Sequence, residues 1–251
     1  MSLALENASV VRGKATILVD ASLMCEPGCL TAICGPNGAG KSTALSLLTG
    51  AERPQSGRAL FCDRDIQSIP IQELARQRAV VSQQHRLSFP FLVHEVVAIG
   101  RAPYQGVTSP AQDADIANAA MARMDLMALS GRNYLTLSGG ERQRTMIARA
   151  LAQVWDAPSN GVRWLILDEP TAALDLKHQI ALMGMLQELA REGWGVLAVL
   201  HDLALVQRYA DKVILMKEAR VDAEGEPKTM LTPEKIAQVY GLAEPYNPAM
   251  T

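Results

Sequence analysis

Alternation of apolar and polar residues near the start of the chain predicts two β-strands. Residues 3–11 and 17–24 both carry the pattern, and a turn at Gly13 and Lys14 separates them. Successive side chains of a strand point to opposite faces, so alternation indicates a half-buried strand. Two such runs joined by a short turn are typical of an antiparallel hairpin.

Beyond the hairpin, short apolar runs alternate with longer segments that have helical spacing. The runs predict strands at residues 30–34, 58–62, 79–82, 164–167, 195–200 and 212–216. The helical spacing predicts helices at residues 41–48, 71–78, 113–127, 141–154, 176–191 and 203–209. Strands that alternate with helices favour an α/β fold, with a mainly parallel sheet covered on both faces.

The middle of the chain, from residue 85 to about residue 133, lacks the strand pattern. We therefore expect an inserted helical subdomain there. Its helix at residues 113–127 places Ile116, Met124 and Met127 on one face, and we expect that face in the core.

Composition narrows the functional classes. The chain has 251 residues, of which 49% are hydrophobic and 20% charged. These proportions are typical of globular proteins. With a net charge of −2, the chain lacks the excess of positive charge that is typical of proteins that bind nucleic acid.

The start of the chain has no basic n-region, so it does not resemble a secretory signal peptide. The apolar runs at residues 89–93 and 194–200 are shorter than the roughly 18–20 residues of a membrane span. The four cysteines lack metal-site spacing, so we expect reduced, mostly buried thiols.

The strongest chemical signal is GPNGAGKS, residues 35–42, between a predicted strand and a predicted helix. It matches the P-loop pattern, in which backbone N–H groups and a helix N-terminus surround phosphate oxygens. Lys41 is expected on the β- and γ-phosphates, and the Ser42 hydroxyl on Mg²⁺. The expected nucleotide-binding residues are Gly35, Pro36, Asn37, Gly38, Ala39, Gly40, Lys41, Ser42 and Thr43.

LILDEP, residues 165–170, is an apolar strand that ends in two acids. Neighbours in a strand point to opposite faces, so Asp168 and Glu169 are expected to differ in role. Asp168 suits Mg²⁺ binding, and Glu169 is expected to polarise a water for attack on the γ-phosphate. The alternative is an exposed turn with two solvated acids.

LSGGERQR, residues 137–144, is locally a capping box, with Ser138 at the N-cap and Glu141 three residues later. Gly139 and Gly140 carry no side chains that could cover the backbone N–H groups at this helix end. The uncovered N-terminus of a helix binds anions, so we expect this one to contact a phosphate and to complete a nucleotide site from one side.

These three motifs, followed by TAALD after LILDEP, resemble the ATP-binding subunit of ABC transporters. LSGGERQR makes the match specific, because a P-loop alone fits many NTPases. The resemblance covers residues 3–240. It implies a P-loop NTPase (RecA-like) core with an N-terminal antiparallel β-subdomain. The implied catalytic core is residues 1–84 and 145–251, and residues 85–144 form the helical subdomain with the signature motif.

The resemblance also assigns roles to residues outside these motifs. Gln83 matches the Q-loop glutamine, so the resemblance implies that it takes part in catalysis and in binding Mg²⁺. His201 matches the switch histidine, which implies a contact with the γ-phosphate. Asp175 matches the D-loop aspartate at the nucleotide site. Arg12 stands where the family usually has an aromatic residue, and its guanidinium plane can stack on a base. His85, His94 and His178 gain no such role.

The implied assembly is a head-to-tail homodimer, with each ATP between the P-loop of one chain and residues 138–140 of the other. The implied partners are two copies of a permease subunit and, indirectly, a periplasmic haem-binding protein. The chain would lie at the cytoplasmic face of the inner membrane and drive the permease through the surface near Gln83 and residues 85–104.

Three segments bear on the cargo. Residues 92–104 look like the ATPases of iron-siderophore, haem and cobalamin uptake, and the insertion at residues 155–164 resembles haem importers in particular. Residues 174–179, LDLKHQ, resemble both haem and siderophore members. Haem is therefore the expected cargo, with an iron-siderophore or cobalamin as the alternative.

A soluble ABC ATPase of DNA repair or translation is the rival from another class. Those proteins usually carry a long coiled coil or two cassettes, and neither fits within 251 residues. A binding module without turnover is the third interpretation, and the presence of Glu169 argues against it.

Overall fold

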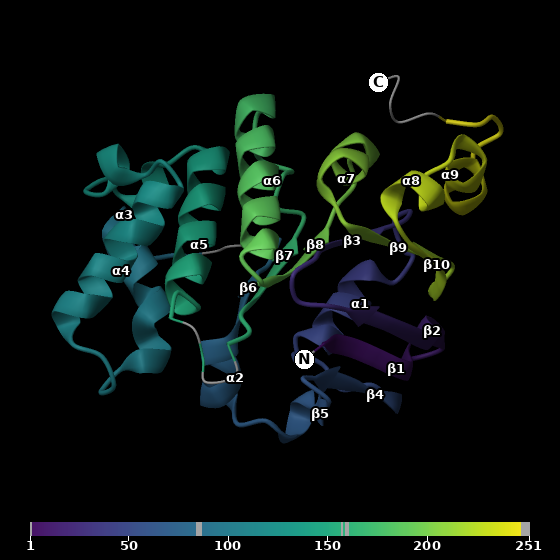
Figure 1. The fold of residues 1–251 in the computed structure, drawn as a ribbon, viewed down its shortest axis with the longest axis horizontal. Coiled ribbons are helices and arrows are strands. Elements are labelled where there is room, and N and C mark those ends of the chain that lie inside the picture. The colour runs from purple at the N-terminus through teal and green to yellow at the C-terminus, as the bar shows by residue number, and fades with distance from the viewer. Residues whose placement is uncertain (1, 84–86, 157, 159–160, 247–251) are drawn as a thin grey trace. The chain divides into compact units, whose positions relative to one another are not determined.

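In the computed structural model, which describes residues 2–83, 87–156, 158 and 161–246, the chain divides into two units. Met1–Pro70 and Met183–Thr251 form the first, and Ile71–Leu182 form the second. Figure 1 labels the elements along the chain. The predicted division into a catalytic core and a helical subdomain is a functional one and stays a prediction.

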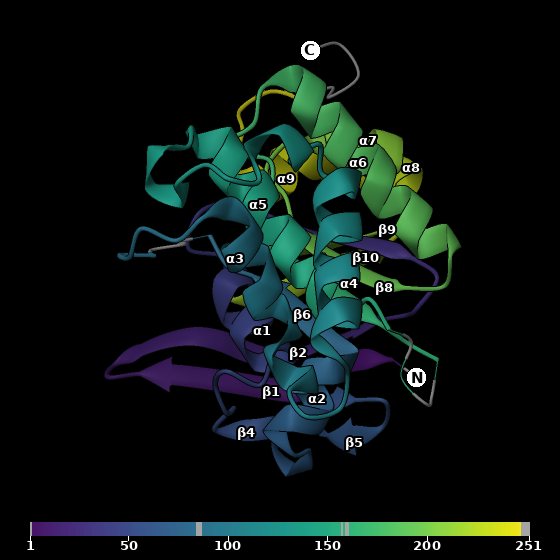
Figure 2. The same ribbon diagram turned by 90° about the vertical axis from the view of Figure 1, so that its left-hand side faces the viewer.

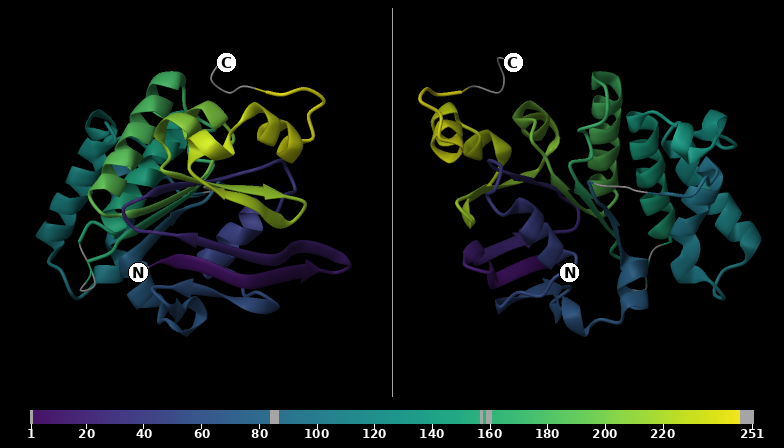
Figure 3. Two further views of the ribbon diagram at one scale, coloured as in Figure 1. Left: turned by 45° about the vertical axis from the view of Figure 1, so that its right-hand side comes forward. Right: turned by 180° about the vertical axis from the view of Figure 1, so that it is seen from behind.

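The predicted hairpin is part of an antiparallel sheet in the first unit. β1 (Leu3–Arg12) pairs with β2 (Ala15–Cys25) on one side and with β4 (Ser56–Phe61) on the other, and β5 (Arg64–Asp65) pairs with β4. Figure 3 shows the hairpin in purple. The antiparallel β-subdomain is confirmed.

The other strands of this unit are mainly parallel. β3 (Leu30–Cys34) lies between β8 (Gly195–Val199) and β9 (Lys212–Lys217) and runs parallel to both, and β10 (Arg220–Gly225) is antiparallel to β9. Every residue of β3 and β8 is buried, as expected for parallel strands covered on both faces. The α/β prediction is confirmed.

Helix α1 (Lys41–Leu48) has the predicted bounds and contacts β1, β2 and β4. It ends where predicted, and Gly50 just beyond it takes the left-handed conformation at φ +71°. The remaining helical elements of this unit are η1 (Ile66–Ser68), α7 (Leu203–Tyr209), α8 (Pro227–Met230) and α9 (Pro233–Tyr240).

The second unit contains a parallel strand pair and a group of helices. β6 (Arg78–Val81) follows α2 (Ile71–Gln77) and runs parallel to β7 (Trp164–Asp168). Helices α3 (Val93–Ala98), α4 (Pro110–Arg123) and α5 (Gly139–Gln153) contact one another, and Figure 2 shows them together. The short turns are η2 (Ile99–Tyr104), η3 (Met127–Leu129) and η4 (Tyr134–Thr136), and α6 (Leu176–Arg191) runs from this unit into the first.

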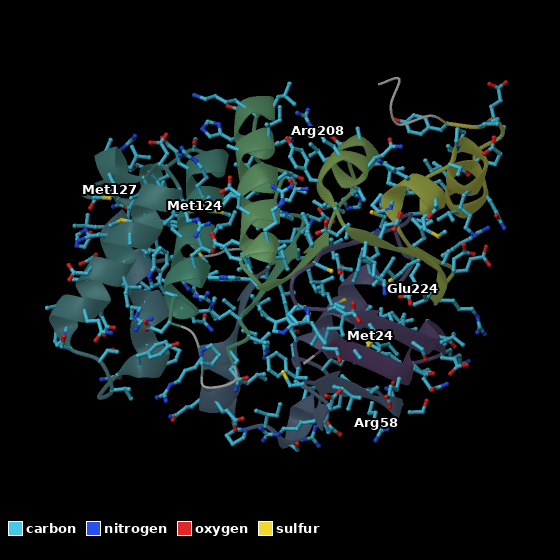
Figure 4. All side chains as sticks on the ribbon, in the orientation of Figure 1. Met24, Arg58, Met124, Met127, Arg208 and Glu224 are labelled. Carbon is cyan, nitrogen blue, oxygen red and sulfur yellow. The ribbon has the colours of Figure 1, made fainter. Side chains whose placement is uncertain are left out.

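One prediction for α4 was wrong. The helix starts earlier than predicted, where the Ser109 hydroxyl accepts the N–H of Gln112, and it ends at Arg123. Asp125 takes a positive φ of +52°, which breaks the helical path. Met124 is still buried, but Met127 lies beyond the helix end and is 51% exposed. Figure 4 labels both methionines.

All four cysteines are free thiols. Cys25 and Cys34 are buried, and their burial raises the pKa of each to about 12. Within the part of the chain that the structure describes, no helix is both long and apolar enough to cross a membrane.

Candidate functional site

The loop between β3 and α1 follows a path that needs glycine at two points. Gly35 has φ +148° and Gly40 has φ +97°. A Cβ on Gly35 would lie 2.1 Å from the carbonyl oxygen of Met216, and one on Gly40 would lie 2.9 Å from that of Ile17. Both contacts are with backbone, which cannot rotate away. The loop therefore has the tight curvature that the P-loop prediction requires.

Lys41 is held inside this loop. Its side chain is 6% exposed, and its ammonium group donates hydrogen bonds to the carbonyl oxygens of Gly35 at 2.7 Å and Pro36 at 2.9 Å. The Cys34 thiol behind the loop is neutral, since burial raises its pKa to about 12. The two hydrogen bonds thus hold the Lys41 ammonium at the loop, and the neutral Cys34 thiol does not offset its charge.

The N-terminus of α1 is open. Its N-cap is Gly40, which offers no side-chain oxygen to the first N–H groups of the helix. Asn37 and Gly38 are exposed at the loop tip, and the side chain of Ser42 is exposed on the first turn. Uncapped N–H groups, a fixed lysine and a hydroxyl on one loop fit a phosphate chain and its metal ion.

Gln83 and Glu169 meet at the ends of two adjacent parallel strands. Gln83 follows β6 and Glu169 follows β7, and the Gln83 amide donates a 2.7 Å hydrogen bond to the Glu169 carboxylate. The contact joins residues 86 positions apart in sequence. Both belong to the predicted catalytic set.

Glu169 has an unusual backbone. Its φ of +50° lies in the left-handed region. That region is uncommon for residues other than glycine, asparagine and aspartate. Such conformations cost roughly 1–3 kcal/mol and cluster at functional sites, where the surrounding structure holds them. The sharp turn lets Asp168 end the strand while Glu169 leaves its path, and both side chains are half-buried.

The start of α5 has the predicted capping box. Ser138 Oγ accepts the N–H of Glu141 at 3.3 Å, and the Glu141 carboxylate accepts the N–H of Ser138 at 2.7 Å. The backbone hydrogen bond from Ser138 lowers the pKa of Glu141. The N–H of Glu141 is therefore satisfied inside the chain, while Gly139 remains exposed and Gly140 half-exposed.

The signature turn lies beside the segment that follows LILDEP. A Cβ on Gly140 would lie 3.2 Å from the carbonyl oxygen of Ala173, which is closer than most Cβ contacts, and one on Gly139 would lie 3.7 Å from Ala173 Cβ. The small residues at these positions let the two motifs approach closely.

Asp175 caps α6. Its carboxylate accepts the His178 backbone N–H at 2.9 Å and lies 2.7 Å from Nδ1 of the same residue. These contacts lower the pKa of Asp175, the backbone hydrogen bond contributing most. Sequence reasoning gave His178 no role, yet it fixes the Asp175 carboxylate. The spacing of three residues at a helix start was the available signal.

Arg12 and His201 both lie at or just beyond the end of a strand. Arg12 ends β1, and its guanidinium lies 2.6 Å from the Glu52 carboxylate on the surface. His201 lies between β8 and the start of α7, where Asp202 is the N-cap. Their roles toward a nucleotide stay predictions.

The predicted metal ligands are all oxygen donors. A hydroxyl (Ser42), an amide (Gln83) and a carboxylate (Asp168) are hard ligands of the kind that Mg²⁺ prefers. Among the described residues, no group of three or more His, Cys, Asp or Glu side chains could hold a metal ion. This donor set fits a metal ion that phosphate and water oxygens also bind.

A pocket that the sequence did not predict lies on the first unit. It has a volume of about 310 Å³ and borders the P-loop tip and the end of α9. Burial raises the pKa of Tyr240 at its wall. The lining residues are Pro36, Asn37, Gly38, Ala39, Lys217, Glu218, Val239, Tyr240 and Gly241.

Comparisons with known proteins identify the family to which the chain is similar. The model of the family described as ABC transporter matches residues 18–172. A hemin import ATP-binding protein from Hahella chejuensis is 45% identical over 232 residues, which is 92% of this chain and 90% of the relative.

Solved structures match as well. An ATP-binding cassette, solved as a dimer in a post-hydrolysis state with ADP and Pi, has a TM-score of 0.78 and 27% identity, covering 90% of this chain and 98% of that one. A transporter assigned to the metal-chelate type, in an inward-facing conformation, has a TM-score of 0.78 and 28% identity, covering 95% and 88% of the two chains.

Proposed function

Since the chain belongs to the ABC transporter family and is an ABC-type ATPase, we propose that it powers the import of haem through a separate permease. The observation that carries the cargo is the 45% identity to a hemin import ATP-binding protein along 90% of that relative's length. The ATPase itself does not need to bind haem, because the cargo passes through the permease.

In the proposed reaction the P-loop binds the phosphates of ATP. The open N–H groups of α1 and the Lys41 ammonium neutralise phosphate oxygens, and the same contacts strengthen as charge moves to the β–γ bridge. Bound Mg²⁺ would supply further charge neutralisation at the β- and γ-phosphates, held by Ser42, Asp168 and Gln83.

Glu169 is the proposed general base. Its carboxylate accepts a proton from the attacking water, and His201 contacts the γ-phosphate. The Gln83 amide supports this role, because its 2.7 Å hydrogen bond restrains the carboxylate in one orientation. Arg12 is the proposed contact to the base of the nucleotide, and its planar guanidinium suits stacking.

We also propose that two copies act together. The solved relative that is a dimer with ADP and Pi supports the association of two copies. In the proposed dimer, Ser138, Gly139 and Gly140 of one copy contact the ATP bound to the P-loop of the other. Asp175 would lie at the same interface. The start of α5 supports the role, because Gly139 is exposed and Gly140 half-exposed, and a helix N-terminus favours an anion.

Ser138→Arg tests the contact between copies. We expect ATP affinity of the single subunit to stay unchanged, because the P-loop is intact, and ATP-dependent dimerisation to be lost, because a bulky cation replaces the small N-cap. Size-exclusion chromatography with light scattering and a nucleotide-binding titration measure the two effects. Ser138→Ala is the matched control, since it removes the cap, worth about 1 kcal/mol, without adding bulk.

Mixed dimers, which combine one Ser138→Arg chain with one wild-type chain, provide the result that would contradict the proposed contact. If dimers with one Ser138→Arg chain hydrolyse ATP at full rate at both sites, then residues 138–140 do not act across the interface.

The proposed partners are two permease subunits and, through them, a periplasmic haem-binding protein. The chain would act as a peripheral subunit at the cytoplasmic face of the inner membrane. The proposed coupling surface is the described part of residues 85–104, which begins at Leu87; His85 lies outside the described residues. Phe89 is 69% exposed and Ile99 is 40% exposed on this segment, so it offers apolar contacts to a partner.

Reconstitution tests the cargo. The chain is placed in liposomes with the permease encoded beside its gene, and ATP hydrolysis is measured with binding protein loaded with haem or with a siderophore. We expect stimulation of ATP hydrolysis by the haem-loaded protein, because the permease completes its transport cycle only with a binding protein that carries its own cargo. Stimulation by the siderophore-loaded protein alone would assign the alternative cargo.

A further inference from the structure

A buried arginine joins four segments of the second unit. Arg101 lies in η2 and is 3% exposed. Its Nε lies 2.9 Å from the Asp113 carboxylate of α4, and its Nη2 lies 2.6 Å from the Asp156 carboxylate in the loop after α5. Its Nη1 donates to the carbonyl oxygen of Ala152 at the end of α5, at 2.9 Å. One side chain thus links η2 to α4, α5 and the insertion that starts at Trp155.

An aromatic ring and a second arginine complete the cluster. The Arg101 guanidinium lies 3.9 Å from the centre of the Tyr104 ring, and that of Arg76 lies 5.4 Å from the same ring. Both distances are within the range of a cation–π contact. The Arg76 Nε also donates to the carbonyl oxygen of Pro103 at 2.9 Å. Both cations therefore contact the C-terminal end of η2.

The backbone of η2 also approaches α5 closely. A Cβ on Gly100 would lie 2.2 Å from the carbonyl oxygen of Arg149, so only glycine fits there. Gly100 sets how close the two segments lie, and Arg101 supplies the directed bonds that fix their register. Since η2 follows α3 without a break, the same bonds restrain the exposed apolar segment that precedes them.

The charges in the cluster do not balance without Arg101. Against the opposing effect of burial, hydrogen bonds from Arg101 and Thr108 lower the pKa of Asp113, so its carboxylate stays ionised at neutral pH. The two carboxylates keep 23% (Asp113) and 36% (Asp156) of their side chains exposed, so water can solvate them when the arginine is removed. Loss of Arg101 would therefore act mainly by removing the three hydrogen bonds that tie η2 to α4, α5 and the loop after α5.

We propose that Arg101 is a positioning residue that holds residues 87–104 in the shape needed to transmit force to the permease, with Asp156 of the insertion as its second anchor. This inference rests on the proposed function. It gives the insertion at residues 155–164 a role: its first described residues secure the coupling surface. Residues 157, 159 and 160 of that insertion lie outside the described residues.

The test compares ATP hydrolysis by the isolated subunit and by the complete transporter with haem-loaded binding protein. For Arg101→Met we expect unchanged hydrolysis by the isolated subunit and about a tenfold loss of stimulation, the size of a typical coupling between sites. Arg101→Lys keeps the charge but not the three directed bonds, so we expect an intermediate loss. Arg58→Met, which removes a surface ion pair with Glu6 in the first unit, is the matched control and should leave stimulation unchanged.

Two further variants separate positioning from general stability. Leu126→Ala removes a fully buried side chain from the same unit without touching the ion pairs. If it lowers stimulation as much as Arg101→Met at equal loss of thermal stability, the proposal is overturned. Asp156→Asn should also lower stimulation, yet add nothing to Arg101→Met, because the bond it removes is already gone; additive losses would contradict the proposal.

Hydrogen exchange of the isolated subunit gives a readout that needs no partner. Arg101→Met should speed exchange at residues 87–104, whereas Arg58→Met should not. Unchanged exchange there would overturn the positioning role. A wild-type complex without any stimulation would instead overturn the proposed function, so the two failures are distinguishable.

Discussion

Glu169→Gln is expected to slow ATP hydrolysis by about 10²–10⁴-fold, the usual contribution of a general base, while ATP binding is retained. The amide has the same shape but cannot accept a proton from water, and the proposed phosphate contacts come from the P-loop. The variant should therefore accumulate as an ATP-bound dimer, because the contacts between copies last as long as the γ-phosphate remains. Single-turnover hydrolysis and light scattering measure the two effects.

The matched control for this variant is Glu188→Gln, the same chemical change at an exposed position of α6. It should hydrolyse ATP at the wild-type rate. Normal turnover by Glu169→Gln would remove Glu169 from the role of base.

Lys41→Ala is expected to weaken ATP binding by about 10²-fold or more, since each hydrogen bond from a charged donor is worth roughly 1.5–3 kcal/mol. The structure adds a second reason. The ammonium also bonds the carbonyl oxygens of Gly35 and Pro36, so its loss frees the loop that presents the N–H groups. Calorimetric titration with ATP measures the change.

Lys14→Ala is the control for this substitution, because Lys14 is an exposed lysine in the turn between β1 and β2. ATP affinity should be unaffected by it. If Lys41→Ala binds ATP as tightly as this control, then the loop does not act as a phosphate cradle.

The elements of the fold that sequence reasoning located best have strong local signals. β3 and α1 have the predicted bounds because a short, mostly apolar run, a glycine-rich turn and a glycine just beyond the helix follow one another closely along the chain. The end of α4 was misplaced because the apolar spacing continues past Asp125, whose backbone leaves the helix. The spacing of apolar residues predicts which side of a helix is buried, but it does not predict the residue at which the backbone leaves the helix.

The region after residue 217 was not predicted at all. β10 has only two apolar residues, and its side chains alternate between exposed and half-exposed, so its pattern is weak. α8 has four residues, too few to show a period. α9 had readable signals, since Thr232 and Pro233 start it and Gly241 ends it.

The site was predictable only in part. Motif spacing located the P-loop, the acids after β7 and the capping box, because each motif is a short run of consecutive residues. The bond between Gln83 and Glu169 and the Arg101 cluster depend on contacts between segments far apart in sequence. No local pattern encodes which distant carboxylate an arginine will meet.

The capping box at the start of α5 bears on how quickly two copies can assemble. Ser138 and Glu141 hydrogen-bond each other within a single chain, so these bonds restrain the turn before a second copy arrives. Little conformational entropy is then lost on association. If the proposed dimer forms in this way, we expect diffusion and orientation to set its rate of assembly, and the survival of the triphosphate between the copies to set its lifetime.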